Sequence, residues 1–140
     1  MNDRYLYRAK RCDTGEWVEG YYAVARDRKG LTQHNILIAD NDIGYFKWIV
    51  VDPSTICRCT GKTDIEKNLI FEHDVVSFLD ATSTEYGYSE HWQVGEVLWD
   101  DETLSFQVTE RLSAESYEVL EECKVIGNIF DNPELLEVGE

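Results

Sequence analysis

Residues 125–136 read VIGNIFDNPELL, and this closing stretch carries the clearest structural signals in the chain. Its first half is apolar and rich in β-branched side chains, so we expect the last strand at residues 123–130. Gly127-Asn128 would let this strand bend or approach a neighbouring strand closely. Asn132-Pro133-Glu134 has the residue types of an N-cap and the first positions of a short helical turn. The stretch therefore predicts a strand that ends in a capped turn.

The preceding sequence shows a similar β-type pattern, divided by turn signals such as Asp13-Thr14-Gly15. Three segments differ from this pattern. Residues 81–90 are polar and predict a loop, Gly95 predicts a bulge, and residues 113–122 are the best helix candidate, with Ser113 as N-cap. We expect the remaining strands at residues 5–9, 17–24, 36–38, 45–51, 55–60, 74–79, 92–99 and 104–108.

Many short strands with regular turns predict a mainly β fold. A chain of 140 residues is long enough for one domain or for two small units packed together. We expect a single domain over residues 1–140 with two sub-regions. Residues 1–60 form a β-hairpin and meander region, and residues 61–140 form an acidic unit resembling a small SH3-like barrel. Short helical turns follow near the C-terminus.

Charge is distributed unevenly along the chain, whose formal net charge is −15. Residues 1–60 hold nine Lys/Arg and eight Asp/Glu, a net charge of +1, whereas residues 61–140 hold four and twenty, a net charge of −16. No Lys or Arg occurs between Lys67 and Arg111. Such a surface repels phosphate, so we expect no direct binding of nucleic acid. It could instead meet a basic protein or the near-neutral first half of a second copy.

Composition indicates a cytoplasmic protein. The N-terminus has no apolar segment typical of a secretory signal, and no run of 18 apolar residues predicts a membrane span. The four cysteines are therefore expected to be thiols rather than disulfides. Cys57 and Cys59 would point to one face of a strand, where they could bind a metal together with Cys12, Cys123 or a histidine. The spacing is not that of a zinc knuckle, and buried apolar cysteines are the favoured interpretation.

Catalytic signatures are sparse. The sequence contains no G-x-S-x-G elbow, no P-loop and no G-x-G-x-x-G, and His34, His73 and His91 lack zinc-type spacing. Glu72-His73-Asp74 could form a proton-transfer or metal cluster. The favoured interpretation is structural: Asp74 begins a strand and accepts backbone N–H bonds from the preceding turn. We therefore expect no catalytic residue, no metal ligand and no cofactor.

Six segments in order along the chain resemble the YopX-like family of phage and prophage proteins. The resemblance implies a β-rich fold and a phage or prophage origin, and it names no chemistry. The segments are YRAKRCDTGEWVEGYY at residues 7–22, VDPSTI at 51–56, TGKTD at 60–64, IFEHDVV at 70–76, GEVLW at 95–99 and VIGNIFDNPELL at 125–136.

Two positions depart from the family pattern, which favours glycine at both. Lys67-Asn68 occupies the turn before the I-F-E segment, and Asn68 would tolerate a left-handed conformation there. His73 stands between Glu72 and Asp74. If its position needs a positive φ, the Cβ of His73 strains or reshapes the turn.

These features lead to three functional hypotheses. The first is a non-enzymatic phage or prophage accessory protein that binds proteins and forms a homo-oligomer. The second is an acidic decoy that imitates DNA charge and binds a basic host protein. The third is a metal-dependent enzyme centred on Glu72, His73, Cys57 and Cys59. Aromatic side chains support the first, because those left outside the core would concentrate at an interface between subunits. The aromatic residues considered are Trp17, Tyr21, Tyr22, Tyr45, Trp48, Trp92 and Trp99.

Overall fold

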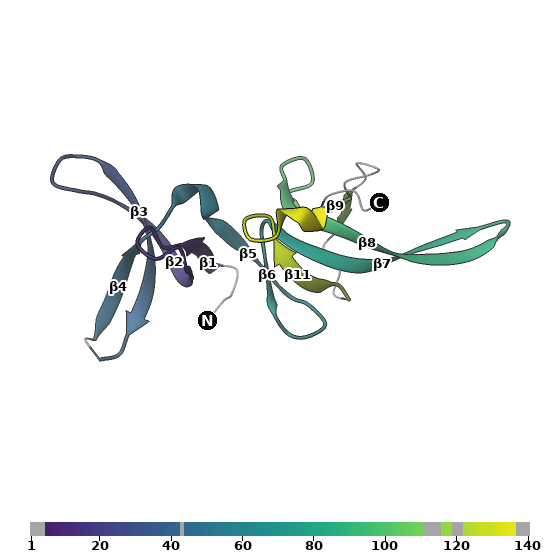
Figure 1. The fold of residues 1–140 in the computed structure, drawn as a ribbon, viewed down its shortest axis with the longest axis horizontal. Coiled ribbons are helices and arrows are strands. Elements are labelled where there is room, and N and C mark those ends of the chain that lie inside the picture. The colour runs from purple at the N-terminus through teal and green to yellow at the C-terminus, as the bar shows by residue number, and fades with distance from the viewer. Residues whose placement is uncertain (1–4, 43, 111–115, 119–121, 137–140) are drawn as a thin grey trace. The chain divides into compact units, whose positions relative to one another are not determined.

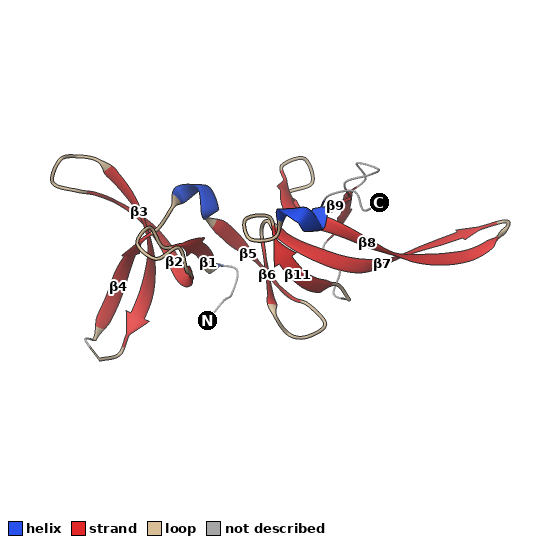
Figure 2. Ribbon diagram, in the orientation of Figure 1, coloured by secondary structure: helices blue, strands red, loops and turns tan. Residues whose placement is uncertain are grey.

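The computed structural model describes residues 5–42, 44–110, 116–118 and 122–136. These residues form antiparallel β-structure with two short 3₁₀ helices, so the prediction of a mainly β fold is confirmed (Figure 2). The chain divides into two compact units, Met1–Gly61 (unit 1) and Lys62–Glu140 (unit 2).

Unit 1 is an antiparallel meander, as predicted for this region (Figure 1). The strand order is β4-β3-β2-β1-β5, and the chain passes into unit 2 along β5. The elements are β1 (Tyr7–Lys10), β2 (Trp17–Arg26), β3 (Thr32–Asp40), β4 (Tyr45–Val50), the 3₁₀ helix η2 (Pro53–Thr55) and β5 (Cys57–Thr63).

The core of unit 1 lies on one face of the meander, where Ala9, Ile36, Ile49 and Val51 are buried together. Buried Thr55 joins η2 to β1: its Oγ1 accepts a hydrogen bond from the Lys10 N–H at 2.8 Å and donates one to the Asp52 carbonyl at 2.7 Å. These bonds satisfy polar groups that would otherwise be buried without a partner.

Unit 2 contains a five-stranded antiparallel sheet in the order β10-β9-β8-β7-β11, and β6 pairs with the end of β5. Its core contains Ile70, Val76, Phe78, Val97, Val108 and Cys123. The described strands do not close, so the expected SH3-like barrel is not confirmed. The elements are β6 (Leu69–Phe71), β7 (Asp74–Thr84), β8 (Gly87–Asp100), β9 (Ser105–Glu110), β10 (Ser116–Glu118), β11 (Lys124–Asn128) and the 3₁₀ helix η3 (Pro133–Leu136).

Residues 81–90 were predicted as a loop, but only residues 85–86 are a turn: β7 and β8 pair continuously out to Thr84 and Gly87. β11 pairs with β7 only up to Ser77, and β9 pairs with β8 only from Gly95. Residues 79–84 and 87–92 therefore form a two-stranded extension of unit 2, here called the ribbon (Figure 1). The prediction failed because Ser and Thr are polar, yet Thr is also a good strand former when a partner strand is present.

Two further predictions in unit 2 are wrong. The helix expected at residues 113–122 coincides with strand β10 at Ser116–Glu118, because these residues pair with β9; residues 113–115 and 119–121 lie outside the described residues. The bulge expected at Gly95 is not there, since the register on both sides of Gly95 is regular. A register shift occurs instead between Val125 and Gly127 in β11.

Asp64 ties the β5–β6 turn to the start of β11. Its buried carboxylate accepts hydrogen bonds from the N–H groups of Glu66 and Asn68, both at 2.9 Å, and from the N–H of Val125 at 3.0 Å. Burial opposes ionisation, but these backbone bonds outweigh it and lower the pKa of Asp64. One side chain thus fixes two segments that are 61 residues apart.

Asparagine side chains bond the backbone of the closing stretch, and Gly127 lies close to one of them. The Asn128 Oδ1 accepts the N–H groups of Phe130 and Asp131, and the Asn132 Oδ1 accepts the N–H of Asn128 at 3.3 Å. A Cβ at Gly127 would lie 2.5 Å from the Asn132 Oδ1. Gly127 therefore leaves the space that the turn leading into η3 occupies.

Both positions that depart from the family's glycines have positive φ. His73 has a φ of 71°, so this position does need the left-handed conformation that strains a residue with a Cβ. Its N–H donates a hydrogen bond to the Val97 carbonyl, and its carbonyl accepts one from the N–H of Ile129. In the other turn the positive φ, 69°, belongs to Lys67 rather than to Asn68. The tolerance of Asn68 for this conformation is therefore not what accommodates the change.

Gly95→Ala tests the close approach of β8 and β9. Its Cβ would lie 2.6 Å from both the Thr109 carbonyl oxygen and the Val108 Cγ1, so the strands must separate. We expect a loss of about 1–3 kcal/mol in the free energy of unfolding, measured by urea titration. Ser89→Ala, at an exposed position on the same strand, is the control and should change it by less than about 0.5 kcal/mol.

Asp64→Asn tests the buried carboxylate. Near neutral pH we expect a loss of about 2 kcal/mol or more, because hydrogen bonds to an ionised group are replaced by weaker ones. Since the pKa of Asp64 is lowered by folding, its stabilisation is complete above the unfolded pKa of about 4 and disappears as the pH falls through the folded value. Urea titrations should therefore show the two proteins converging in acid.

The control for this pH effect is Glu66→Gln, since the exposed Glu66 carboxylate lies 3.9 Å from Lys124. Such an exposed pair contributes little, so this variant should follow the wild type within about 1 kcal/mol. A difference between wild type and Asp64→Asn that stays constant from neutral pH into acid would contradict the assignment.

Candidate functional site

Several exposed apolar side chains of unit 2 lie on the ribbon and at its tip. Tyr86 at its tip is 92% exposed, Trp92 is 67% exposed, and Tyr88 and Leu79 are exposed as well. Side chains directly opposite each other in an antiparallel pair share a face, and Leu79 lies opposite Trp92. Because side chains alternate along a strand, Tyr88 lies on that same face. The ribbon therefore presents a one-sided apolar strip to solvent.

One charged residue lies within this strip. Glu90 alternates with Tyr88 and Trp92 on β8, so it points to the same face, and the Tyr88 hydroxyl donates a hydrogen bond to its carboxylate. Its neighbours on the facing strand segment are Ala81 and Ser83. The strip is thus apolar with a single negative charge near its centre.

Unit 1 has a second exposed apolar surface on its edge strand, β4. Five of the six side chains of this strand are exposed, and Ile49 alone among them is buried. Phe46 and Trp48 point away from the Ile49 side, and Phe46 makes an edge contact with Tyr21 at 6.2 Å between ring centroids. Lys47, between Phe46 and Trp48, is the one charged residue of the strand. β4 therefore exposes two aromatic side chains on one face, while Lys47 alternates with them and points to the Ile49 side.

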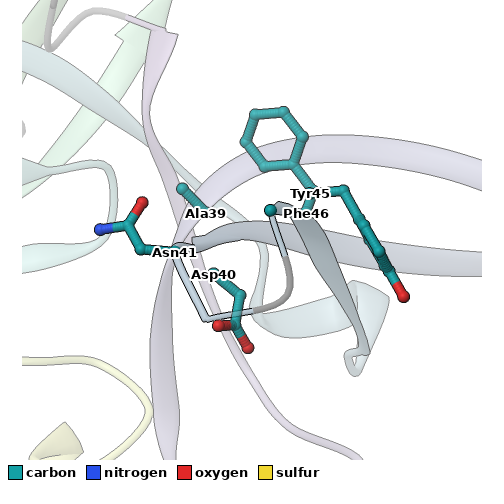
Figure 3. A pocket seen from close by; sticks show the side chains of 6 residues that line it. Ala39, Asp40, Asn41, Tyr45 and Phe46 are labelled. Carbon is teal, nitrogen blue, oxygen red and sulfur yellow. The ribbon is translucent and has the colours of Figure 1, made fainter.

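Two hollows adjoin β4. The first, of about 230 Å³, lies at the β3–β4 turn, where Tyr45 and Phe46 project beside Ala39 and Asp40 (Figure 3). The second, of about 320 Å³, is lined by Lys47, Trp48 and the β1–β2 turn. Polar and charged side chains line both hollows beside the aromatic rings: Asp40 and Asn41 in the first, Arg11, Asp13 and Lys47 in the second.

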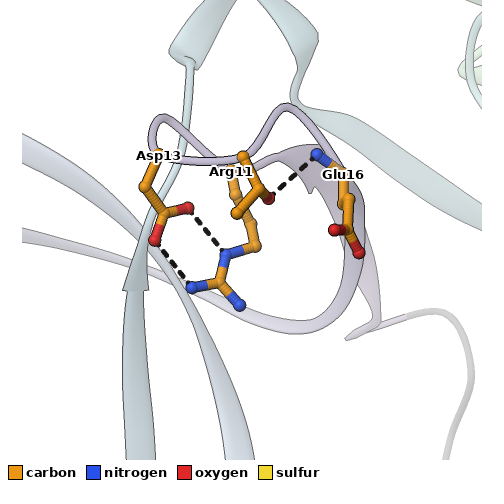
Figure 4. Close-up of polar contacts among 4 residues, drawn as sticks. Arg11, Asp13 and Glu16 are labelled. Atoms are coloured by element: carbon orange, nitrogen blue, oxygen red, sulfur yellow. Dashed lines mark hydrogen bonds and ion pairs between the residues drawn. The ribbon is translucent and has the colours of Figure 1, made fainter.

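The β1–β2 turn beside the second hollow is well ordered by its own polar contacts. The guanidinium of Arg11 donates two hydrogen bonds of 2.8 Å to the carboxylate of Asp13, and the Glu16 N–H bonds to the hydroxyl of Thr14 (Figure 4). The bond from Arg11 lowers the pKa of Asp13. Arg11 is therefore engaged within its own turn, and Lys47 is the cation that β4 itself presents.

Among the described residues, Glu72, His73 and Asp74 do not group as metal ligands would. Buried Asp74 accepts the Phe71 N–H at 2.8 Å, which is the structural role expected for it. His73 points elsewhere: its Nδ1 lies 2.8 Å from the Glu96 Oε2, and its ring contacts Phe130. Glu96 also lines a hollow of about 300 Å³ beside Leu136. The described polar contacts of His73 and Asp74 thus connect them to different parts of unit 2.

All four cysteines lie within the described residues and are thiols. Cys57 and Cys59 are buried on one face of β5, Cys12 is exposed, and Cys123 belongs to the core of unit 2. Burial, with a smaller contribution from the Asp64 carboxylate, raises the pKa of the Cys123 thiol. In the part of the chain that the structure describes, no three His, Cys, Asp or Glu side chains are grouped as metal ligands would be.

The exposed aromatic residues were identified only in part from the sequence. Among those considered, Tyr45, Trp48 and Trp92 are exposed, whereas Trp17 and Trp99 are partly buried. Tyr21 and Tyr22 are partly buried too. Tyr86 and Tyr88 were missed because their segment was expected to be a loop. The alternation of Tyr88, Glu90 and Trp92 was the signal that could have identified them.

Comparison with known proteins adds the lineage of the chain. Residues 6–137, which span both units, match the family described as YopX protein. The comparison with curated proteins finds no match. No helix among the described residues is long and apolar enough to cross a membrane. Because the matched segment covers nearly the whole chain, this protein belongs to the YopX family.

Proposed function

We propose that this protein is a non-enzymatic accessory protein of a phage or prophage, which acts in the bacterial cytoplasm by binding proteins and assembles with copies of itself. Membership of the YopX family suggests a phage- or prophage-type protein. The observation that carries the binding part of the proposal is the ribbon, where Tyr88 and Trp92 are exposed on β8 and Tyr86 is exposed in the turn between β7 and β8.

The physical argument is that such a ribbon is costly to maintain alone. An isolated two-stranded hairpin is marginally stable in water, because it has no covered apolar face. Tyrosine and tryptophan, the residue types at positions 88 and 92, concentrate at the centres of protein interfaces. A partner that covers Trp92 and Leu79 would remove their apolar surface from water and hold the two strands together. The ribbon is therefore well suited to binding.

The edge strand β4 supports the same proposal. A sheet edge has unpaired backbone groups, and natural proteins usually protect it with charge or cover it. β4 carries one charged side chain, Lys47, between the exposed Phe46 and Trp48. An association that covers this edge would bury both aromatic rings.

A second candidate function is suggested by charge. Unit 2 combines twenty Asp/Glu with four Lys/Arg, and its exposed turn at residues 101–104 includes Asp101 and Glu102. As an acidic decoy it would capture a basic host protein from a lysate and release it at 0.5 M salt, where charges are screened within about 4 Å. Capture that is unchanged at 0.5 M salt would argue against the decoy.

Sedimentation velocity tests the leading proposal. The wild-type protein should sediment as an oligomer at micromolar concentration. The double variant Tyr88→Ser/Trp92→Ser should associate at least about tenfold more weakly, because it removes two interface aromatics. Leu31→Ser is the matched control, since Leu31 is 62% exposed in a different part of the chain, and it should behave as wild type. A wild-type protein that stays monomeric across the micromolar range would refute self-assembly.

A further inference from the structure

We infer that the ribbon carries a binding site for an arginine side chain of a basic partner protein, formed by Glu90 between Tyr88 and Trp92. This inference rests on the proposed function and deepens it, because it names the chemical group that the ribbon recognises. The three residues alternate along β8 and therefore share one face. All three side chains are exposed, Tyr88 at 64% and Trp92 at 67%.

The facing strand of the ribbon leaves the Glu90 carboxylate without an opposite charge. The register places Glu90 opposite Ala81, and the neighbouring positions of β7 on the same face are Leu79 and Ser83. The ribbon contains no Lys or Arg, since none occurs between residues 67 and 111. A cation that pairs with Glu90 is therefore supplied from outside the ribbon.

Tyr88 holds the carboxylate in position. Its hydroxyl donates a hydrogen bond to the Glu90 Oε1, and this bond raises the pKa of Tyr88, so the hydroxyl stays protonated near neutral pH. An ionised carboxylate has lone pairs on both oxygens and can accept further N–H groups beside this bond. A guanidinium donates two parallel N–H bonds to a carboxylate, and its flat face stacks on aromatic rings. An arginine side chain thus fits both kinds of group that the site exposes.

The aromatic rings distinguish this site from an ordinary surface carboxylate. A cation within about 6 Å of a ring centre is attracted to the face of the ring, most strongly by tryptophan. Residues two apart along a strand are separated by about 7 Å, so a guanidinium bonded to Glu90 lies within reach of both rings. An exposed ion pair alone contributes little to binding. The carboxylate and the rings must therefore act together.

The outer edge of β8 indicates how a partner presents its arginine. Among the described residues, β9 pairs with β8 only from Gly95, so the segment from Tyr88 to Trp92 is paired on one side, with β7. An extended segment of a partner can add to the other side as a third strand. The arginine then lies opposite Glu90, and apolar residues two positions away on each side lie opposite the rings. A third strand also stabilises a ribbon that is marginal as two strands.

Charge favours a basic protein over a second copy of this chain as the occupant. Residues 61–140 carry a net charge of −16, and such a surface raises the local concentration of cationic partners. A second copy brings a formal net charge of −15 and is repelled at long range. The proposed self-assembly through Tyr88 and Trp92 would compete with this partner for the same rings.

Peptide binding to the full-length protein tests the site. The probe is the blocked peptide leucine-threonine-arginine-threonine-leucine, and two matched peptides carry lysine or citrulline in place of arginine. Citrulline has nearly the shape of arginine but no charge. NMR shifts of the ribbon amides and of the Trp92 indole give the dissociation constants. The arginine peptide should bind at least about threefold more tightly than the lysine peptide and at least about tenfold more tightly than the citrulline peptide.

Variants assign this preference to the three side chains. Glu90→Gln should reduce the preference for arginine over citrulline to about twofold or less, because the charged acceptor is lost. Glu85→Gln removes the same charge at the exposed turn of the ribbon and should leave the preference unchanged. Tyr88→Phe removes only the hydroxyl that positions the carboxylate, and Trp92→Leu removes a ring but keeps an apolar side chain. Each should weaken binding of the arginine peptide by about threefold. Amide spectra establish that every variant folds.

The outcomes separate this inference from the proposal beneath it. Equal binding of the arginine and citrulline peptides, or a preference that survives Glu90→Gln, would overturn the arginine site. Equal binding of the arginine and lysine peptides would overturn its assignment to a guanidinium. None of these results touches self-assembly, which sedimentation of Tyr88→Ser/Trp92→Ser measures separately. A monomeric wild-type protein that prefers the arginine peptide would refute self-assembly and support this site.

Discussion

The buried carboxylate of Asp64 is the interaction on which unit 2 depends. It is 3% exposed and accepts three backbone hydrogen bonds, two within its own turn and one from Val125. A buried carboxylate without such partners would cost several kcal/mol or become protonated. With them, it joins the β5–β6 turn to the strand that follows Cys123. The register of β11 against β7, and the turn after Asn128, follow from where that strand begins.

Close backbone approaches are the second constraint. Gly95 and Gly127 lie where a Cβ would collide with β9 or with Asn132, so each glycine is required by its neighbour rather than by its own φ. The opposite occurs at Lys67 and His73, which take left-handed conformations without being glycine. His73 is held there by two backbone hydrogen bonds and by Glu96. Its unusual backbone thus has a structural cause, and the Glu72-His73-Asp74 sequence reflects a strained turn.

The ribbon is less covered by other elements than the rest of unit 2. The proximal parts of β7 and β8 are covered by the core around Phe78 and Val97, whereas the distal parts are paired only with each other in the described residues. Such an extension gains little from its own folding, and its aromatic side chains remain in water. Assembly through the ribbon would supply the missing apolar contact.

The sequence by itself determined the β class, most strand positions, the lineage and the separation of charge, because alternation, turn residues and composition are local properties. It also indicated the structural role of Asp74, since an Asp after a turn can bond backbone N–H groups locally. Tertiary structure decided that residues 81–90 form a ribbon, that Ser116–Glu118 are strand, and that Lys67 rather than Asn68 is left-handed. It also decided which aromatics remain exposed. The physical reason is that strand pairing and burial depend on partners far away along the chain, and a local pattern does not specify those partners.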